Sequence, residues 1–192
     1  MTARYMLRRP SAYFKNTITF KLKRHPIRKL IVIRDPRDCL VSLCFNFKYG
    51  PASQWDTPWR SILADVHKEQ GLLRMMHLVA RTVEIQQSWL KAPQTLLVRY
   101  EDLIADPHSV FDGIMDYCRL KVSPQTLRKI VERNDFEKIT GRKPGQEDLR
   151  AQLRKGVAGD WRNHFSVTVK DVFKQQFGNA LVNAGYEDDF EW

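Results

Sequence analysis

Short apolar runs alternate along the chain with longer stretches in which apolar residues recur at helical spacing. Residues 30–33 form one run rich in β-branched side chains, and residues 95–99 (TLLVR) form another. Uninterrupted runs of this kind are typical of strands buried on both faces. Between them, residues 66–90 place apolar side chains along one helix face, and Pro93 ends the pattern. The order of strand, helix and strand predicts two parallel strands.

Three places carry the signal of a helix start, an N-cap side chain followed by proline at the first helical position. They are Asp35-Pro36, Asp106-Pro107 and Ser123-Pro124. The first of these helices is expected to run to about Lys48 and to stop at Gly50-Pro51. Each start therefore adds a helix to the strands described above.

Two segments show loop signals in place of a periodic pattern. Residues 50–60 combine two tryptophans with two prolines, and residues 140–160 hold glycines and few apolar groups. Residues 169–184 then close the pattern as an amphipathic helix. We predict an α/β domain in which helices flank a parallel sheet.

The composition fits one globular domain with a sizeable core. The chain has 192 residues, 43% of them hydrophobic, with nine glycines and nine prolines. No apolar run approaches the roughly 18 residues that a membrane span needs. Three cysteines lack metal-ligand spacing, and an odd number argues against a disulfide framework. These features favour a cytoplasmic protein with no metal site and no membrane span.

The positive charge is concentrated at the start of the chain. The net charge of +10 comes from 32 basic and 22 acidic residues, and no acidic residue precedes Asp35. We therefore separate residues 1–29, a basic amino-terminal segment, from residues 30–192. The segment could be an RNA- or membrane-binding arm or a transit peptide. A solvated basic segment beside an anion-binding fold is favoured, because the remainder is close to neutral, and no nucleic-acid partner is expected.

Arg34 stands between the first predicted strand and the helix that begins at Asp35. Ligands of open α/β sheets bind at the carboxyl ends of strands, where a helix N-terminus adds oriented N–H groups. An arginine suits a phosphate there, because its planar fork can bind two oxygens. Ser42, two helical turns further on, could add a hydroxyl. The alternative is that Arg34 pairs with Asp38 or a distant carboxylate, and this motif alone leaves both open.

Two further segments carry a family resemblance. Residues 99–107 (RYEDLIADP) place an aromatic and acids after the second strand, and residues 154–165 (RKGVAGDWRNHF) set two cations beside a glycine. Together with residues 34–42 (RDPRDCLVS), they resemble the sulfotransferases that use 3′-phosphoadenosine 5′-phosphosulfate (PAPS). The resemblance implies a P-loop-kinase-like α/β fold, with residues 30–192 as the sulfotransferase domain.

The resemblance also implies a nucleotide site for PAPS and its product, adenosine 3′,5′-bisphosphate. Arg34 and Ser42 match the family's ligands of the 3′-phosphate. Arg154, Lys155 and Gly156 match the loop that closes on the same phosphate. Two arginines, a lysine and a hydroxyl are suitable partners, because a charge-assisted hydrogen bond is roughly twice as strong as a neutral one.

Aromatic residues complete the implied nucleotide pocket. Tyr100 matches the aromatic that lines it, and Phe136 matches the one that packs on the adenine. The alternative is that both are ordinary core residues. Asp160 and Trp161, within the cation-bearing segment, are interpreted as structural.

The implied activity is transfer of a sulfuryl group from PAPS to a hydroxyl of a small molecule or a glycan. Residues 162–171 (RNHFSVTVKD) resemble the family's dimer-contact motif, which implies a homodimer. The family's glycine-containing lysine-serine loop, which wraps the 5′-phosphosulfate, has no counterpart, since no glycine precedes Gly50. The catalytic base is also unknown, because His25 reads as a surface residue.

We therefore expect an amino-terminally incomplete sulfotransferase domain, and the activity of the chain as it stands is left open. Two alternatives stay open. The first is a catalytically dead nucleotide-binding remnant, and the second is a basic RNA- or membrane-binding protein that uses residues 1–29.

Overall fold

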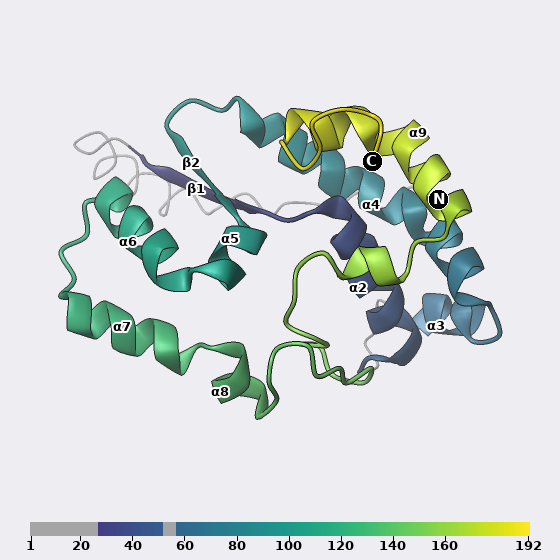
Figure 1. Cartoon of the computed structure of the whole chain (residues 1–192), viewed down its shortest axis with the longest axis horizontal. Coiled ribbons are helices and arrows are strands. Elements are labelled where there is room, and N and C mark those ends of the chain that lie inside the picture. Colours follow the sequence, from purple (N-terminus) through teal and green to yellow (C-terminus); the bar gives the residue numbers. More distant parts are fainter. Residues whose placement is uncertain (1–26, 52–56) are drawn as a thin grey trace, which may run out of the picture.

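The computed structural model describes residues 27–51 and 57–192. Over these residues it is a mixed α/β structure, with a short parallel sheet beside an array of helices (Figure 1). Residues 1–26, which include His25 and most of the predicted basic segment, lie outside the described part. None of the described helices is long and apolar enough to cross a membrane.

The described sheet consists of β1 (Lys29–Ile33) and β2 (Thr95–Arg99), which pair in parallel. Ile33 lies opposite Arg99 at the carboxyl ends of both strands. Parallel strands need a long crossover, and here it is helical, as predicted. Its elements are α2 (Pro36–Tyr49), α3 (Thr57–Leu63) and α4 (Lys68–Leu90).

The apolar run of β1 predicted burial on both faces of the strand, and this prediction is wrong. Leu30 is 41% exposed and Val32 is 52% exposed, whereas Ile33 is 1% exposed. Within the described residues, β2 is the only strand that pairs with β1. The apolar run indicates a surface suited to burial, but no described element covers the side that carries Leu30 and Val32.

α2 begins as its capping signal predicts. The Asp35 carboxylate accepts a hydrogen bond of 2.8 Å from the Arg37 N–H, and Pro36 occupies the first helical position. At the other end, the Gly50 N–H donates to the carbonyl of Asn46 at 2.9 Å. The predicted helix from Pro36 to about Lys48 is thus confirmed.

The hydrophobic core lies where α2, α4 and α9 (Val167–Asn183) pack together (Figure 1). Leu40 of α2, Leu72 of α4 and Phe173 of α9 are fully buried within it. Burial of one such side chain stabilises a fold by about 1.5–3 kcal/mol. The core therefore holds α2 firmly, and with it the side chains at the start of that helix.

The next four helices after β2 lie in the left half of Figure 1, whereas α3 lies at the right. They are α5 (Tyr100–Ala105), α6 (Pro107–Cys118), α7 (Pro124–Arg133) and α8 (Phe136–Thr140). The predicted starts at Pro107 and Pro124 are confirmed, because Asp106 and Ser123 each accept a backbone N–H of the first turn. α5 and α8 were not predicted, since helices of five or six residues are too short to show a periodic pattern.

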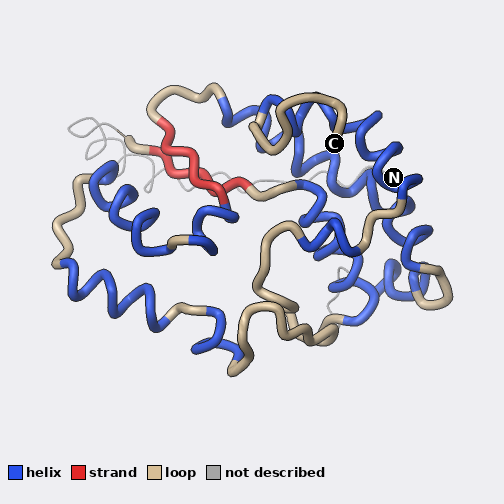
Figure 2. The backbone as a smooth tube through the Cα atoms, viewed as in Figure 1, coloured by secondary structure: helices blue, strands red, loops and turns tan. Residues whose placement is uncertain are grey.

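A long loop joins α8 to the 3₁₀ helix η1 (Asp160–Asn163), as predicted for residues 140–160 (Figure 2). The loop predicted over residues 50–60 is wrong in its last part, where α3 begins at Thr57 and Trp59 packs against the core. Residues 52–56 of that prediction lie outside the described part. α9 starts two residues earlier than predicted, because Ser166 caps it by accepting the Val169 N–H at 3.3 Å.

Candidate functional site

Arg34 and Tyr100 lie side by side at the carboxyl ends of the two strands. Each directly follows a strand, and the register pairs Ile33 with Arg99. The guanidinium carbon of Arg34 is 4.4 Å from the centroid of the Tyr100 ring, a cation–π contact. The structure thus brings together two of the predicted site residues.

Arg34 keeps unused hydrogen-bond donors. Within residues 27–51 and 57–192 it forms no ion pair, and its Nε is buried without a hydrogen-bond partner. Asp38, the alternative partner considered from the sequence, binds backbone N–H groups instead. Because a guanidinium has five N–H donors, Arg34 retains the capacity to bind an anion.

The carboxylate of Asp38 attaches the loop before η1 to the first turn of α2. It accepts the Gly159 N–H at 2.6 Å and the Trp161 N–H at 2.8 Å. Burial raises the pKa of Asp38 above its usual value, although these two hydrogen bonds act in the opposite direction. The segment that contains Arg154 and Lys155 is therefore held against α2.

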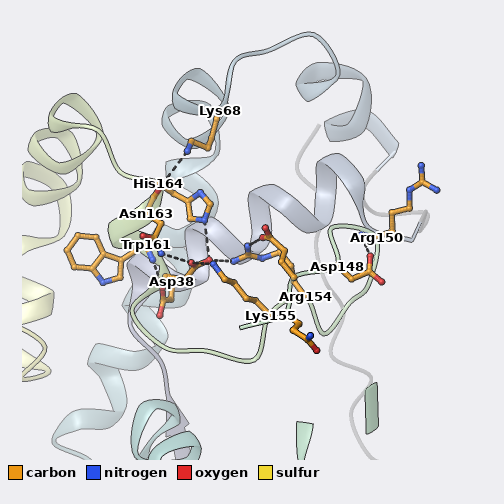
Figure 3. Close-up of polar contacts among 12 residues, drawn as sticks. Asp38, Lys68, Asp148, Arg150, Arg154, Lys155, Trp161, Asn163 and His164 are labelled. Atoms are coloured by element: carbon orange, nitrogen blue, oxygen red, sulfur yellow. Dashed lines mark hydrogen bonds and ion pairs between the residues drawn. The ribbon is translucent and has the colours of Figure 1, made fainter. Parts of the chain in front are cut away.

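The carboxylate of Asp160 binds both cations of that segment. Figure 3 shows Arg154 and Lys155 on the same side of η1 as Asn163 and His164. The Asp160 carboxylate accepts hydrogen bonds from Arg154 Nη2 at 2.5 Å and Lys155 Nζ at 2.6 Å. It also lies 3.0 Å from Asn163 Nδ2 and 3.1 Å from His164 Nε2. Burial alone would raise the pKa of Asp160, but the hydrogen bonds outweigh it and hold this pKa well below the usual value. Burial lowers the pKa of His164, against the opposing effect of Asp160.

Arg154 has two further contacts. It forms an ion pair with Glu147, and its guanidinium carbon lies 4.6 Å from the centroid of the Phe45 ring on α2. Its Nε is buried without a hydrogen-bond partner. Arg154 therefore packs on Phe45 of α2, and Phe45 lies three residues beyond Ser42 in the sequence.

Ser42 lies on the face of α2 that this segment covers. Asp38, Ser42 and Phe45 stand at positions i, i+4 and i+7, which share one helix face. Asp38 binds the segment's backbone and Phe45 contacts Arg154, so Ser42 lies between two points of contact. Its hydroxyl forms no hydrogen bond within the described part of the chain.

Gly156 and Phe136 are in direct contact. Gly156 has a φ of +66°, and a Cβ built on it would lie 2.5 Å from Cδ2 of Phe136. Both the left-handed backbone and the close approach require glycine. Phe136 is half-buried and Arg142 lies over its ring, 5.3 Å from the centroid. The aromatic therefore packs on the cation-bearing segment and is not part of the main core.

Sequence reasoning missed the carboxylates that order the site. Asp38 was considered only as a partner for Arg34, and its contact with Gly159 spans 121 positions in the sequence. No local pattern reveals a contact of that range. Asp160 was interpreted as structural, yet it follows its two cations by five and six positions. That spacing is a signal that could have identified it.

Comparisons with known proteins agree with the sequence resemblance. The family model described as sulfotransferase domain matches residues 13–185. Rat Sulfotransferase 1C2 is 31% identical over 169 residues, which cover 80% of this chain and 56% of that protein. Human Sulfotransferase 2A1 is 26% identical over 166 residues, with the same two coverages. The chain thus spans about half the length of the curated relatives it matches.

A solved structure supports the fold. Mouse sulfotransferase SULT7A1 complexed with PAP aligns with 87% of this chain and 62% of its own, at a TM-score of 0.61 and 17% identity. At this identity the likeness concerns the fold alone. It confirms the α/β fold, with a parallel sheet and flanking helices, that the sequence led us to expect.

Proposed function

Because the chain belongs to the sulfotransferase domain family, we propose that it binds PAPS for transfer of a sulfuryl group to a hydroxyl acceptor. One observation carries this proposal. Arg154 and Lys155 both bind a single carboxylate, at 2.5 and 2.6 Å, on the face of α2 that carries Ser42. Two cations already directed at one oxyanion are suited to a phosphate beside it.

The 3′-phosphate is the group that this cluster fits. Lys155 has three N–H donors and Arg154 has five, and only some of them bind Asp160 and Glu147. The remaining donors, the Ser42 hydroxyl and the free guanidinium edge of Arg34 can bind phosphate oxygens. Gly156 lets the segment approach closely, because a side chain there would meet Phe136.

Tyr100 and Phe136 are proposed as aromatic walls of the adenosine pocket. Tyr100 lies under Arg34 at the strand ends, and Phe136 packs on Gly156. Each aromatic thus contacts one of the proposed phosphate-binding residues. A nucleoside whose 3′-phosphate meets those residues would bring its base and ribose near these rings.

The described residues would bind and orient the nucleotide. In the reaction, the acceptor oxygen forms a bond to sulfur and loses its proton to a base, while the S–O bond to the leaving 5′-phosphate breaks and a cation offsets the charge that develops on that phosphate. We assign neither the base nor that cation to a described residue. Holding the nucleotide in one orientation contributes to catalysis by itself, because it lowers the entropic part of the barrier. The acceptor is proposed to be a hydroxyl of a small molecule or a glycan, with no nucleic-acid partner.

Nucleotide binding without turnover is the second candidate. Residues 1–49 contain no glycine, whereas a phosphate-wrapping loop relies on glycine. Transfer of labelled sulfate from PAPS to simple phenols or alcohols would exclude this candidate. Tight binding of the bisphosphate without any transfer would favour it.

Self-association through residues 162–171 is also proposed, together with a cytoplasmic location. Val167 is 75% exposed, and Arg162 and Asp171 beside it are exposed as well. Reversing the charge at Arg162 or Asp171 alone should raise the monomer fraction, and reversing both should partly restore the dimer. A wild type that stays monomeric in light scattering at all concentrations would contradict the dimer.

The proposed cytoplasmic location is supported by the three cysteines, which are all free.

Calorimetry tests the proposed function through one quantity, the 3′-phosphate increment. We define it as the affinity for adenosine 3′,5′-bisphosphate divided by the affinity for adenosine 5′-monophosphate. Hydrogen bonds to charged groups are worth about 1.5–3 kcal/mol each, so an increment of at least about tenfold is expected. Arg34→Ala should reduce it strongly, whereas Arg81→Ala, which removes an exposed arginine of α4, should not. Equal wild-type affinity for both nucleotides would overturn the proposal.

A further inference from the structure

The guanidinium of Arg37 is enclosed at the start of α2. It is 1% exposed and lies between two indole rings, 3.9 Å from the centroid of Trp161 and 4.5 Å from that of Trp192. Its ion pairs go to Asp35, at 2.7 Å, and to Glu187, which follows α9. A buried charge is costly unless it is paired. These partners therefore determine where Arg37 lies, and Arg37 in turn holds Asp35.

A second contact reaches Asp35 from the same segment after α9. The Glu101 carboxylate accepts the Asp35 N–H at 2.9 Å through one oxygen and the Tyr186 hydroxyl at 3.3 Å through the other. Burial raises the pKa of Tyr186 above its usual value, and the nearby carboxylates add to this effect. The hydroxyl therefore stays protonated and remains a donor to Glu101.

The end of β2 binds the backbone of this segment directly. Arg99 donates to the carbonyl of Ala184 at 2.5 Å and to that of Gly185 at 2.8 Å. Its guanidinium carbon lies 5.1 Å from the centroid of the Tyr186 ring. A cation at the carboxyl end of a helix is favourable for the helix dipole. Residues 184–187, which we call the tail anchor, are thus joined to both β2 and α2.

We propose that the tail anchor positions Arg34 for the 3′-phosphate. The contacts through Arg37 and through Glu101 converge on Asp35, the residue next to Arg34. The Asp35 N–H and the Arg34 carbonyl belong to one planar peptide unit. Ile33, on the other side of Arg34, is held by its pairing with Arg99, so fixing that unit restricts the direction in which the Arg34 side chain leaves the backbone. The inference rests on the proposed function, because it assigns a positioning role at the same site.

A positioning role and a charge effect of Glu187 predict opposite changes in the affinity for the 3′-phosphate when Glu187 is replaced. Coulomb's law alone predicts that removing a negative charge near a cationic site strengthens the binding of an anion. If Glu187 instead holds Arg37, and through it Asp35 and Arg34, its loss should weaken binding of the 3′-phosphate. The sign of the change therefore separates the two effects.

The test compares Glu187→Gln with Asp188→Asn by calorimetry. Both variants remove one carboxylate from adjacent positions, but Asp188 is exposed and has no contact with Arg37 within the described residues. We expect Glu187→Gln to lower the 3′-phosphate increment about tenfold, equivalent to ~1.4 kcal/mol, with the monophosphate affinity nearly unchanged. Asp188→Asn should leave the increment unchanged. An increment that is unchanged or raised in folded Glu187→Gln would overturn the proposal.

A second variant, and hydrogen exchange measured without nucleotide, test the tail anchor if Glu187→Gln does not fold or if the wild type shows no 3′-phosphate increment. If Glu187→Gln does not fold, Tyr186→Phe removes only the hydroxyl bound to Glu101 and should lower the increment about threefold. Hydrogen exchange of the Asp35 amide should also become faster in either variant, and unchanged exchange would contradict the anchor. A wild type with no increment would refute the proposed function, whereas the exchange rate would still test the anchor.

Discussion

β1 and α2 are consecutive in the chain, yet they differ in how completely the described residues cover them. Val32 of β1 is 52% exposed, whereas Leu40 of α2 is fully buried. β1 pairs with β2 alone, while α2 packs against α3, α4 and η1. The difference shows that the side chains at the start of α2 are ordered by contacts within the described chain. The outer side of β1 takes no part in that ordering.

The covered region also contains the ordered charges. Asp38 attaches the backbone N–H groups of Gly159 and Trp161 to α2, and Asp160, which lies in η1, binds the side-chain cations of the segment before it. Hydrogen bonds to a charged group are typically worth about 1.5–3 kcal/mol each. The proposed anion site would therefore be largely preformed, which lowers the entropic cost of binding.

The largest expected effect is a difference in stability between variants of α2 and variants of β1. Leu40→Ala should lower the free energy of unfolding by about 3 kcal/mol, because it leaves a cavity in the core. Val32→Ala should lower it by less than about 1 kcal/mol, since half of that side chain is already in contact with solvent. Urea denaturation of both variants measures the difference. Equal losses would mean that β1 is covered as completely as α2.

The next effect concerns the ion pairs that join Arg154 and Lys155 to Asp160 of η1. Asp160→Asn should lower the free energy of unfolding by about 3 kcal/mol at pH 7, because Arg154 and Lys155 lose their shared carboxylate.

The pH dependence of this loss follows from the sign of the shift. The pKa of Asp160 is lower in the folded state than its usual value of 3.8, so its stabilising effect is complete above that value. This effect disappears as the pH falls through the folded pKa. Unfolding curves of wild type and variant should therefore converge in strong acid, and a difference independent of pH would contradict the assignment.

A smaller effect is expected where Gly156 meets Phe136. Gly156→Ala and Gly141→Ala both place alanine at positive φ, +66° and +70°, at a cost of about 1–2 kcal/mol. Only at Gly156 would the new Cβ also clash, 2.5 Å from Phe136, since nothing lies within 4 Å at Gly141. We expect Gly156→Ala to be the more destabilising by about 1 kcal/mol in thermal unfolding. Equal losses would show that Phe136 can move away freely.

Local signals predicted the parts of the fold that depend on local contacts. The caps at Asp35, Asp106 and Ser123 act within one helical turn, so their residue types alone indicate the helix starts. The parallel strand pair followed from the alternation of strand and helix. The exposure of Val32 could not be predicted from the sequence. An apolar run shows that a strand is suited to burial, but it does not show whether another element covers the strand.

The sequence suggested candidate residues for the site, but it could not predict the contacts among them. Arg34, Arg154 and Lys155 were identified by resemblance, and the cation–π contact of Arg34 with Tyr100 follows from strand register. The ion pairs with Asp160 depend on how the segment folds back on itself. The bond from Gly159 to Asp38 joins positions 121 apart. Such contacts arise from tertiary packing, which no local pattern encodes.

The central claim is that the cations beside Ser42 bind the 3′-phosphate, and Lys155→Ala tests it most directly. Lys155 is the most exposed cation of the Asp160 cluster, so its loss should leave the fold intact. Calorimetry of wild type and variant with adenosine 3′,5′-bisphosphate and adenosine 5′-monophosphate forms a thermodynamic cycle. We predict that the variant binds the bisphosphate about tenfold more weakly and binds the monophosphate as wild type does. An equal loss of affinity for both nucleotides, or no change in either affinity, would contradict the account.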